Sequence, residues 1–189
     1  MQHSLVRSEE GTSSERVTTG LELSGSPDAV WRCLMFYEDV PRRPWPLLRF
    51  VLPQPRFSQG DKLSVGSPIR CVYDRGYLVK RITHVEPMRF LGFEVLEQRL
   101  GIERYGVASR GSYELETVAR GTRVVLTTSY LGKLRPRFVF RWFERYLCHR
   151  LHRHILLGMS ERLQSEAERP SALTSGVGRG ADTAAAPSR

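Results

Sequence analysis

The sequence predicts an α+β fold in which one long helix packs across one face of an antiparallel β-sheet. Between residues 48 and 131, six β-like runs follow one another with short connections. The stretch from Arg135 to Arg169 then carries an apolar residue at every fourth position and has no proline between Pro136 and Pro170, which is typical of a long amphipathic helix. Such a helix buries its apolar stripe against the preceding sheet. The stripe consists of Val139, Phe143, Leu147, Leu151, Ile155, Met159 and Leu163.

A strand and a short helix are expected before these runs. Residues 17–24 carry their more apolar side chains at alternate positions, which predicts a half-buried strand. The sequence Ser26-Pro27-Asp28 predicts a helix start, because it offers a serine N-cap, a proline in the first turn and an acid at the positive end of the helix dipole. An apolar stripe over residues 30–35 continues this helix. Three prolines between residues 41 and 46 allow only a broken second helix or a loop.

The β-like runs are joined as in an antiparallel meander. Asp74-Arg75-Gly76 and Ala119-Arg120-Gly121 place glycine where a hairpin needs a positive φ. Tyr113 and Leu115 alternate with two glutamates, which indicates a sheet with one face in water. The runs are Leu48–Pro55, Ile69–Asp74, Tyr77–Val85, Phe90–Gln98, Val107–Val118 and Thr122–Leu131.

The length of 189 residues suits one domain, which we expect at residues 17–169. Residues 1–16 and 170–189 are polar or rich in small residues and are expected to be disordered tails. No apolar run reaches the roughly 18 residues of a membrane span, and residues 1–16 lack the apolar segment of a secretory signal. The cysteines, at positions 33, 71 and 148, are widely spaced in apolar sequence, which indicates reduced thiols in a cytoplasmic protein.

Four sequence motifs together resemble a known superfamily. They are Ser26-Pro27-Asp28-Ala29-Val30-Trp31 after the first strand, Val85-Glu86-Pro87 leading to Leu91 and Phe93, Gly121-Thr122-Arg123-Val124 in a hairpin, and the long final helix. In this order they resemble the START-like (SRPBCC) superfamily, and within it the polyketide cyclase/dehydrase and lipid-transport group, over about residues 17–168.

This resemblance implies a helix-grip fold of birch-allergen type. In that fold a curved antiparallel β-sheet wraps around a long C-terminal helix, with two short helices after the first strand and a largely apolar cavity between sheet and helix. The superfamily includes lipid carriers, ubiquinone-binding proteins and aromatic cyclases, so the fold alone leaves the function open.

We therefore expect this cavity to bind a small hydrophobic ligand: a lipid, an isoprenoid or a polyketide-like molecule. The sequence offers no catalytic triad, phosphate loop or metal cluster, and we expect neither a cofactor nor a metal. The alternative for the candidate lining residues is an ordinary packed core. The candidates are Trp45, Phe50, Tyr73, Phe93, Tyr113, Leu126, Tyr130, Phe143, Leu147 and Leu151.

An enzyme is the alternative function. Counting along alternating strands places Arg81 and Glu97 on the inward faces, near Tyr113. An arginine–glutamate pair beside a tyrosine could polarise a carbonyl for ring closure, as in a polyketide cyclase or dehydratase. A β-bulge would instead turn Arg81 or Glu97 to solvent or into a rim salt bridge.

The basic residues suggest a second alternative, a peripheral membrane or protein-interaction module. The net charge is +9, and Arg137, Arg141, Arg145 and Arg153 follow helical spacing in the final helix. Cations in the first turns oppose the helix dipole, which favours an anionic partner surface. The competing explanation is GC-rich coding, because 26 of the 29 basic residues are arginine. Nucleic acid is not the expected partner, because the stripe lacks interleaved exposed aromatic residues. The sequence leaves the oligomeric state open.

Histidines are also concentrated in the final helix. His149 and His152 share one face, whereas His154 lies on another, so the three cannot bind one metal ion. We expect them to be surface residues.

Overall fold

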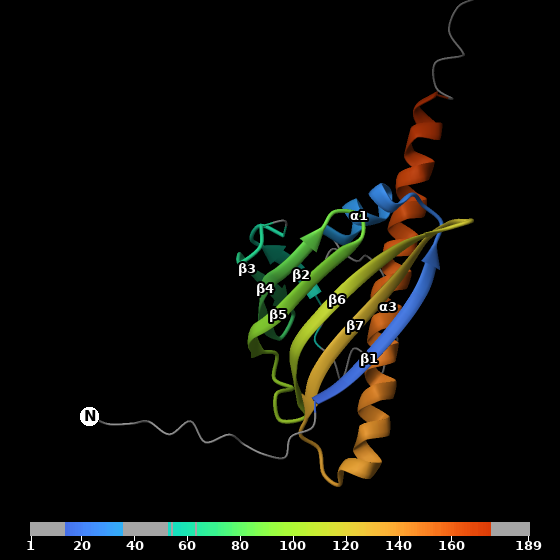
Figure 1. The fold of residues 1–189 in the computed structure, drawn as a ribbon. Helices are drawn as coiled ribbons and strands as arrows, with labels where there is room; N and C mark the ends of the chain where they lie inside the picture. The colour runs from blue at the N-terminus through green and yellow to red at the C-terminus, as the bar shows by residue number, and fades with distance from the viewer. Residues whose placement is uncertain (1–13, 36–52, 54, 63, 175–189) are drawn as a thin grey trace, which may run out of the picture.

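The computed structural model describes residues 14–35, 53, 55–62 and 64–174. Within these ranges, a seven-stranded antiparallel sheet carries two helices on one face (Figure 1). The elements are β1 (Ser14–Leu23), α1 (Pro27–Met35), β2 (Pro55–Gln59), β3 (Pro68–Tyr73), β4 (Gly76–Glu86), β5 (Phe90–Arg99), β6 (Gly106–Val118), β7 (Gly121–Gly132) and α3 (Arg137–Thr174).

The strands lie in the order β1-β7-β6-β5-β4-β3-β2, so β2 to β7 form a meander and β1 closes against β7. Figure 1 shows the twisted sheet with α3 running behind β7 and β1 and extending past the ends of the strands. Helix α3 packs on β1, β7 and α1. The strands β2 to β4 therefore lie toward the opposite edge of the sheet from β1 and β7, the strands on which α3 packs.

Two hairpins depend on glycine as expected. Gly76 and Gly121 have φ angles of 138° and 145°, which side chains with a Cβ rarely adopt. A Cβ on Gly76 would collide with the carbonyl oxygen of Arg99, and one on Gly121 would collide with that of Leu23. Each glycine thus permits a tight turn against a neighbouring backbone.

The core fills the space between the concave sheet face and the two helices. Leu156, Met159 and Leu163 of α3 are buried against Val30 and Leu34 of α1 and the inward side chains of the sheet. The apolar stripe of α3 is thus buried only in its C-terminal half.

The predicted helix-grip fold is confirmed. Five of the six predicted runs match β3 to β7 within one residue at each end. The predicted strand Leu48–Pro55 lies almost wholly outside the described residues, as does the predicted second helix, and β2 at Pro55–Gln59 was not predicted.

Two boundaries differ from the expectation. β1 begins at Ser14, three residues early, because its Glu15 is buried in ion pairs with α3. α3 begins at Arg137 and continues through Pro170 to Thr174. An interior proline removes one backbone donor and crowds the preceding turn, so this continuation is costly. The sequence around Pro170 includes good helix formers such as Ala167, Ala172 and Leu173.

Candidate functional site

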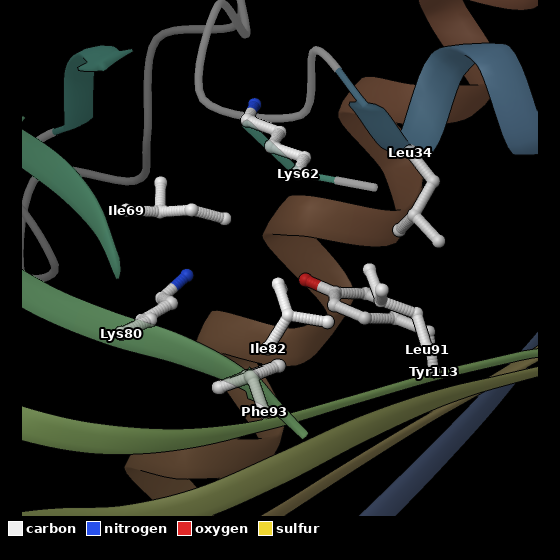
Figure 2. Close-up of a pocket in the computed structure, with 8 residues that line it drawn as sticks. All are labelled: Leu34, Lys62, Ile69, Lys80, Ile82, Leu91, Phe93 and Tyr113. Carbon is white, nitrogen blue, oxygen red and sulfur yellow. The ribbon is translucent and has the colours of Figure 1, made fainter. Parts of the chain in front are cut away.

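A small pocket lies between the inward face of β3 to β6 and helix α1 (Figure 2). Its volume is about 20 Å³, room for about one water molecule. Apart from two lysines and one tyrosine, the lining is apolar. The lining residues are Leu34, Lys62, Ile69, Lys80, Ile82, Leu91, Phe93 and Tyr113.

Lys80 is the unusual member of this lining. Lys80 lies on β4 between Leu78 and Ile82, which also point inward, and only 7% of its surface is exposed. Its ammonium nitrogen lies 4.8 Å from the ring centroid of Phe93, within cation–π range. Burial lowers the pKa of Lys80 to about 7, because the charged form loses its hydration. An amine that can be neutral or charged near neutral pH therefore lies at an apolar pocket.

Tyr113 supplies the other buried polar group. It lies on β6 opposite Leu91 of β5, and its ring is tilted against Phe93 at a centroid distance of 6.3 Å. Figure 2 shows the Tyr113 hydroxyl and the Lys80 amine both directed toward the middle of the pocket. The pocket can thus present an amine and a phenol to an apolar molecule.

Of the predicted ligand contacts that the structure describes, Phe93 and Tyr113 line this pocket. Leu126 is buried beside Tyr113 in the core. The other described candidates lie elsewhere: Tyr73 and Tyr130 on the inward face outside the lining, and Phe143, Leu147 and Leu151 on α3. Trp45 and Phe50 lie outside the described residues.

This pocket lies under α1 and is distinct from the cavity predicted between the sheet and the C-terminal helix, which stays a prediction. Helix α3 contributes none of its lining residues. The reason is topological, because α3 packs on β1 and β7 while the pocket opens over β3 to β6.

The expectation that Arg81 and Glu97 point inward is wrong. Arg81 pairs with Glu94 at 3.3 Å on the outer face, where the two side chains are 47% and 42% exposed. Glu97 accepts hydrogen bonds from the Tyr77 hydroxyl at 2.9 Å and the Arg99 Nε at 3.2 Å. Hydrogen bonds from these two groups lower the pKa of Glu97.

A β-bulge explains the position of Glu97. Val95 pairs with Lys80, but Glu97 pairs with Val79, so β5 holds one extra residue between these positions. The bulge reverses which residues face inward beyond Val95. On β4 the inward set is Leu78, Lys80 and Ile82, one residue out of step with the prediction. Both β4 faces carry apolar residues, so alternation alone left the choice of face ambiguous.

One sequence signal could have identified Lys80. Lysine occurs at only three positions, in a chain whose other 26 basic residues are arginine. Lysine loses its proton when buried, whereas arginine stays charged. A lysine within a β-strand of an arginine-rich chain is therefore a candidate titratable group.

The predicted arginine stripe of α3 is largely engaged within the protein. Glu15 of β1, only 4% exposed, lies 2.9 Å from Arg141, 3.6 Å from Arg145 and 3.7 Å from Arg137. Arg137 also pairs with Glu144 at 2.8 Å. Three of the four arginines expected to form an open anionic-partner surface thus bind carboxylates of the same chain, while Arg153 is exposed.

His152 is not the surface residue that was expected. It is 1% exposed, and its two ring nitrogens lie 2.8 Å from Thr128 Oγ1 and 3.1 Å from Thr19 Oγ1. Burial lowers its pKa to about 4, so the ring is neutral at neutral pH. His149 also contacts Thr19, at 2.8 Å. Within the described ranges, no three His, Cys, Asp or Glu residues are grouped to hold a metal ion.

The three cysteines are free thiols: Cys33 and Cys71 are buried, and Cys148 is half-buried.

In the part of the chain that the structure describes, no helix has the length and apolar character to cross a bilayer.

The elements and their order define a helix-grip fold. The chain resembles an aromatase/cyclase from Streptomyces with a TM-score of 0.53 and 16% identity, over 87% of this chain and 100% of that one. Norcoclaurine synthase from Thalictrum flavum, solved with dopamine and hydroxybenzaldehyde, matches with a TM-score of 0.53 and 13% identity, over 82% of this chain and 88% of that one.

A Thermus thermophilus protein matches with a TM-score of 0.54 and 16% identity, over 80% of this chain and 99% of that one. No protein-family model and no curated protein sequence matches the chain. The likeness to these solved structures, at 13–16% identity, shows the helix-grip fold.

Proposed function

We propose that this protein binds a small, mainly apolar ligand with an acidic head group, and that Lys80 contacts the head. The observation that carries this proposal is a buried lysine in a pocket wall that is apolar apart from Lys80, Lys62 and Tyr113. Burial costs an ammonium group its hydration, and an anionic group bound beside it would offset part of that cost.

A carboxylate suits this position for an electrostatic reason. In a pocket with few water molecules, an ammonium and a carboxylate attract each other more strongly than in solvent. The apolar part of the ligand would contact Ile69, Ile82 and Leu91. Because the pocket holds about one water molecule, a ligand has to displace flexible lining groups, among them the Lys62 side chain. Norcoclaurine synthase, a structure of the same fold solved with dopamine and hydroxybenzaldehyde, supports a small organic occupant in general, while the acidic head is argued from Lys80 alone.

The proposal predicts that ligand affinity depends on pH. Binding an anion favours the charged amine, and Lys80 has a pKa of about 7 in the free protein. Above that pH the protein must take up a proton on binding, so affinity should fall by about tenfold per pH unit. Decanoate is a suitable probe and decanol its neutral control, titrated calorimetrically.

Lys80→Met should abolish the preference for decanoate over decanol, whereas Lys133→Met, at an exposed position, should retain it. We expect the parent protein to prefer decanoate by about tenfold or more below pH 7, the value of one charge-assisted hydrogen bond. Native mass spectrometry of the purified protein would show any ligand retained from the cell. Equal binding of both probes, or binding of neither, would contradict the proposal.

A cyclase-type enzyme is a second candidate, favoured by the convergence of Lys80 and Tyr113 on one pocket. A neutral amine could remove a proton next to a carbonyl, and a phenol could donate a hydrogen bond to the resulting enolate. Arg81 and Glu97 cannot take part in this chemistry, because they lie on the outer face. Ring closure of a linear polyketone that both Lys80→Met and Tyr113→Phe abolish would support this candidate. Turnover unaffected by either substitution would contradict it.

A further inference from the structure

The first turns of α3 carry an exposed aromatic stripe, which consists of Phe138, Trp142 and Tyr146. Phe138 is 84% exposed and Trp142 is 73% exposed. The Trp142 and Tyr146 rings stack at a centroid distance of 6.1 Å with an interplanar angle of 14°. Val139 and Phe143 lie beside the stripe and are also exposed. Contiguous exposed aromatic residues on one helix face mark an interaction surface.

The fold holds this stripe outward. The adjoining side of the same turns, about 100° around the helix, is attached to β1 through the ion pairs of Arg137, Arg141 and Arg145 with Glu15. Rotating α3 to bury the aromatic rings would break these contacts and leave Glu15 buried without a cation. The exposure is therefore a consequence of the packing of α3, not of a loose helix end.

The charge around the stripe indicates the chemistry of the partner. Lys133 and Arg135 precede the stripe in the chain, and the three paired arginines adjoin it on the helix. Glu15 and Glu144 offset two of these five cations. The local net charge is therefore +3, which opposes contact with a second copy of the same face. Tryptophan and tyrosine prefer the boundary between lipid headgroups and acyl chains, and cations next to them attract anionic headgroups.

We infer that the aromatic stripe of α3 docks on the surface of an anionic lipid bilayer, with Phe138 and Trp142 inserted at the headgroup boundary. The helix lies on the membrane and does not cross it. This inference is independent of the ligand proposed for the pocket.

Vesicle flotation of the full chain tests the inference. The protein should float with vesicles of phosphatidylcholine and phosphatidylglycerol, and at least about tenfold less with phosphatidylcholine alone. Phe138→Ser with Trp142→Ser should reduce flotation on the anionic vesicles about tenfold or more. Phe57→Ser, at an exposed aromatic residue on β2, is the matched control and should leave flotation unchanged.

Further measurements distinguish membrane insertion from dimerisation and from a purely electrostatic contact. Lys133→Gln with Arg135→Gln should weaken flotation without affecting the thermal unfolding midpoint, because both side chains are exposed. Tryptophan emission should shift to the blue on anionic vesicles in the parent and not in Trp142→Phe. The inference is overturned if flotation is absent, if it ignores lipid charge, or if the double serine variant floats like the parent. Concentration-dependent dimerisation that the serine variant loses, without lipid binding, would instead assign the stripe to a second copy.

Discussion

Replacing Lys80 by methionine should stabilise the protein, in a manner that depends on pH. Methionine has a similar unbranched length and removes the charge that has to be desolvated. The pKa of Lys80 falls from 10.5 in the unfolded chain to about 7 in the native state. A difference of about 3.5 pH units corresponds to about 5 kcal/mol of unfolding free energy.

The sign follows from proton binding. Between pH 7 and 10.5 the unfolded chain holds the proton and the native state does not, so the stability of the parent rises with pH across this window. The penalty from Lys80 is complete below pH 7 and disappears near pH 10.5. The advantage of Lys80→Met should therefore be about 5 kcal/mol near pH 6 and about 2 kcal/mol near pH 9.

Urea unfolding followed by circular dichroism at these two pH values measures the difference. Lys133→Met is the control and should show no such pH dependence, because Lys133 is exposed. A variant that is less stable than the parent, or more stable by the same amount at both pH values, would show that Lys80 is not a desolvated amine.

Two further predictions concern the polar layer between α3 and β1. The pKa of His152 is lowered to about 4, so on acidification the unfolded chain takes up a proton on this residue before the native state does. The free energy of unfolding should therefore fall by about 3 kcal/mol between pH 6.5 and pH 4. His152→Gln should remove this pH-dependent loss from unfolding curves recorded across that range. Glu15→Gln leaves three arginines without their shared carboxylate and should cost about 3 kcal/mol in urea unfolding, whereas Glu22→Gln, on the exposed face of β1, should cost less than about 0.5 kcal/mol. Equal losses for the two glutamates would contradict the role of Glu15.

The architecture was predictable because its signals are local. The Ser26-Pro27-Asp28 start, the glycines of two hairpins and the strand periodicity each fix one element within a few residues. Together they allow few ways of covering the sheet. The pocket was less predictable, because its members come from four strands, a helix and a loop, and their inward direction depends on register. A single bulge in β5 was enough to move Glu97 from the inner to the outer face.

Helix α3 shows most clearly what the sequence leaves open. A spacing of four residues fits three parallel stripes in the first turns: an arginine stripe from Arg137, an aromatic stripe from Phe138 and an apolar stripe from Val139. Hydrophobicity favours burying either of the last two. The structure instead turns the arginine stripe toward β1, because the buried Glu15 lies on the inward face of β1 and pairs with its three guanidinium groups. A carboxylate on a different strand thus decides which face of α3 meets the sheet, and by that choice it leaves the aromatic residues on the surface.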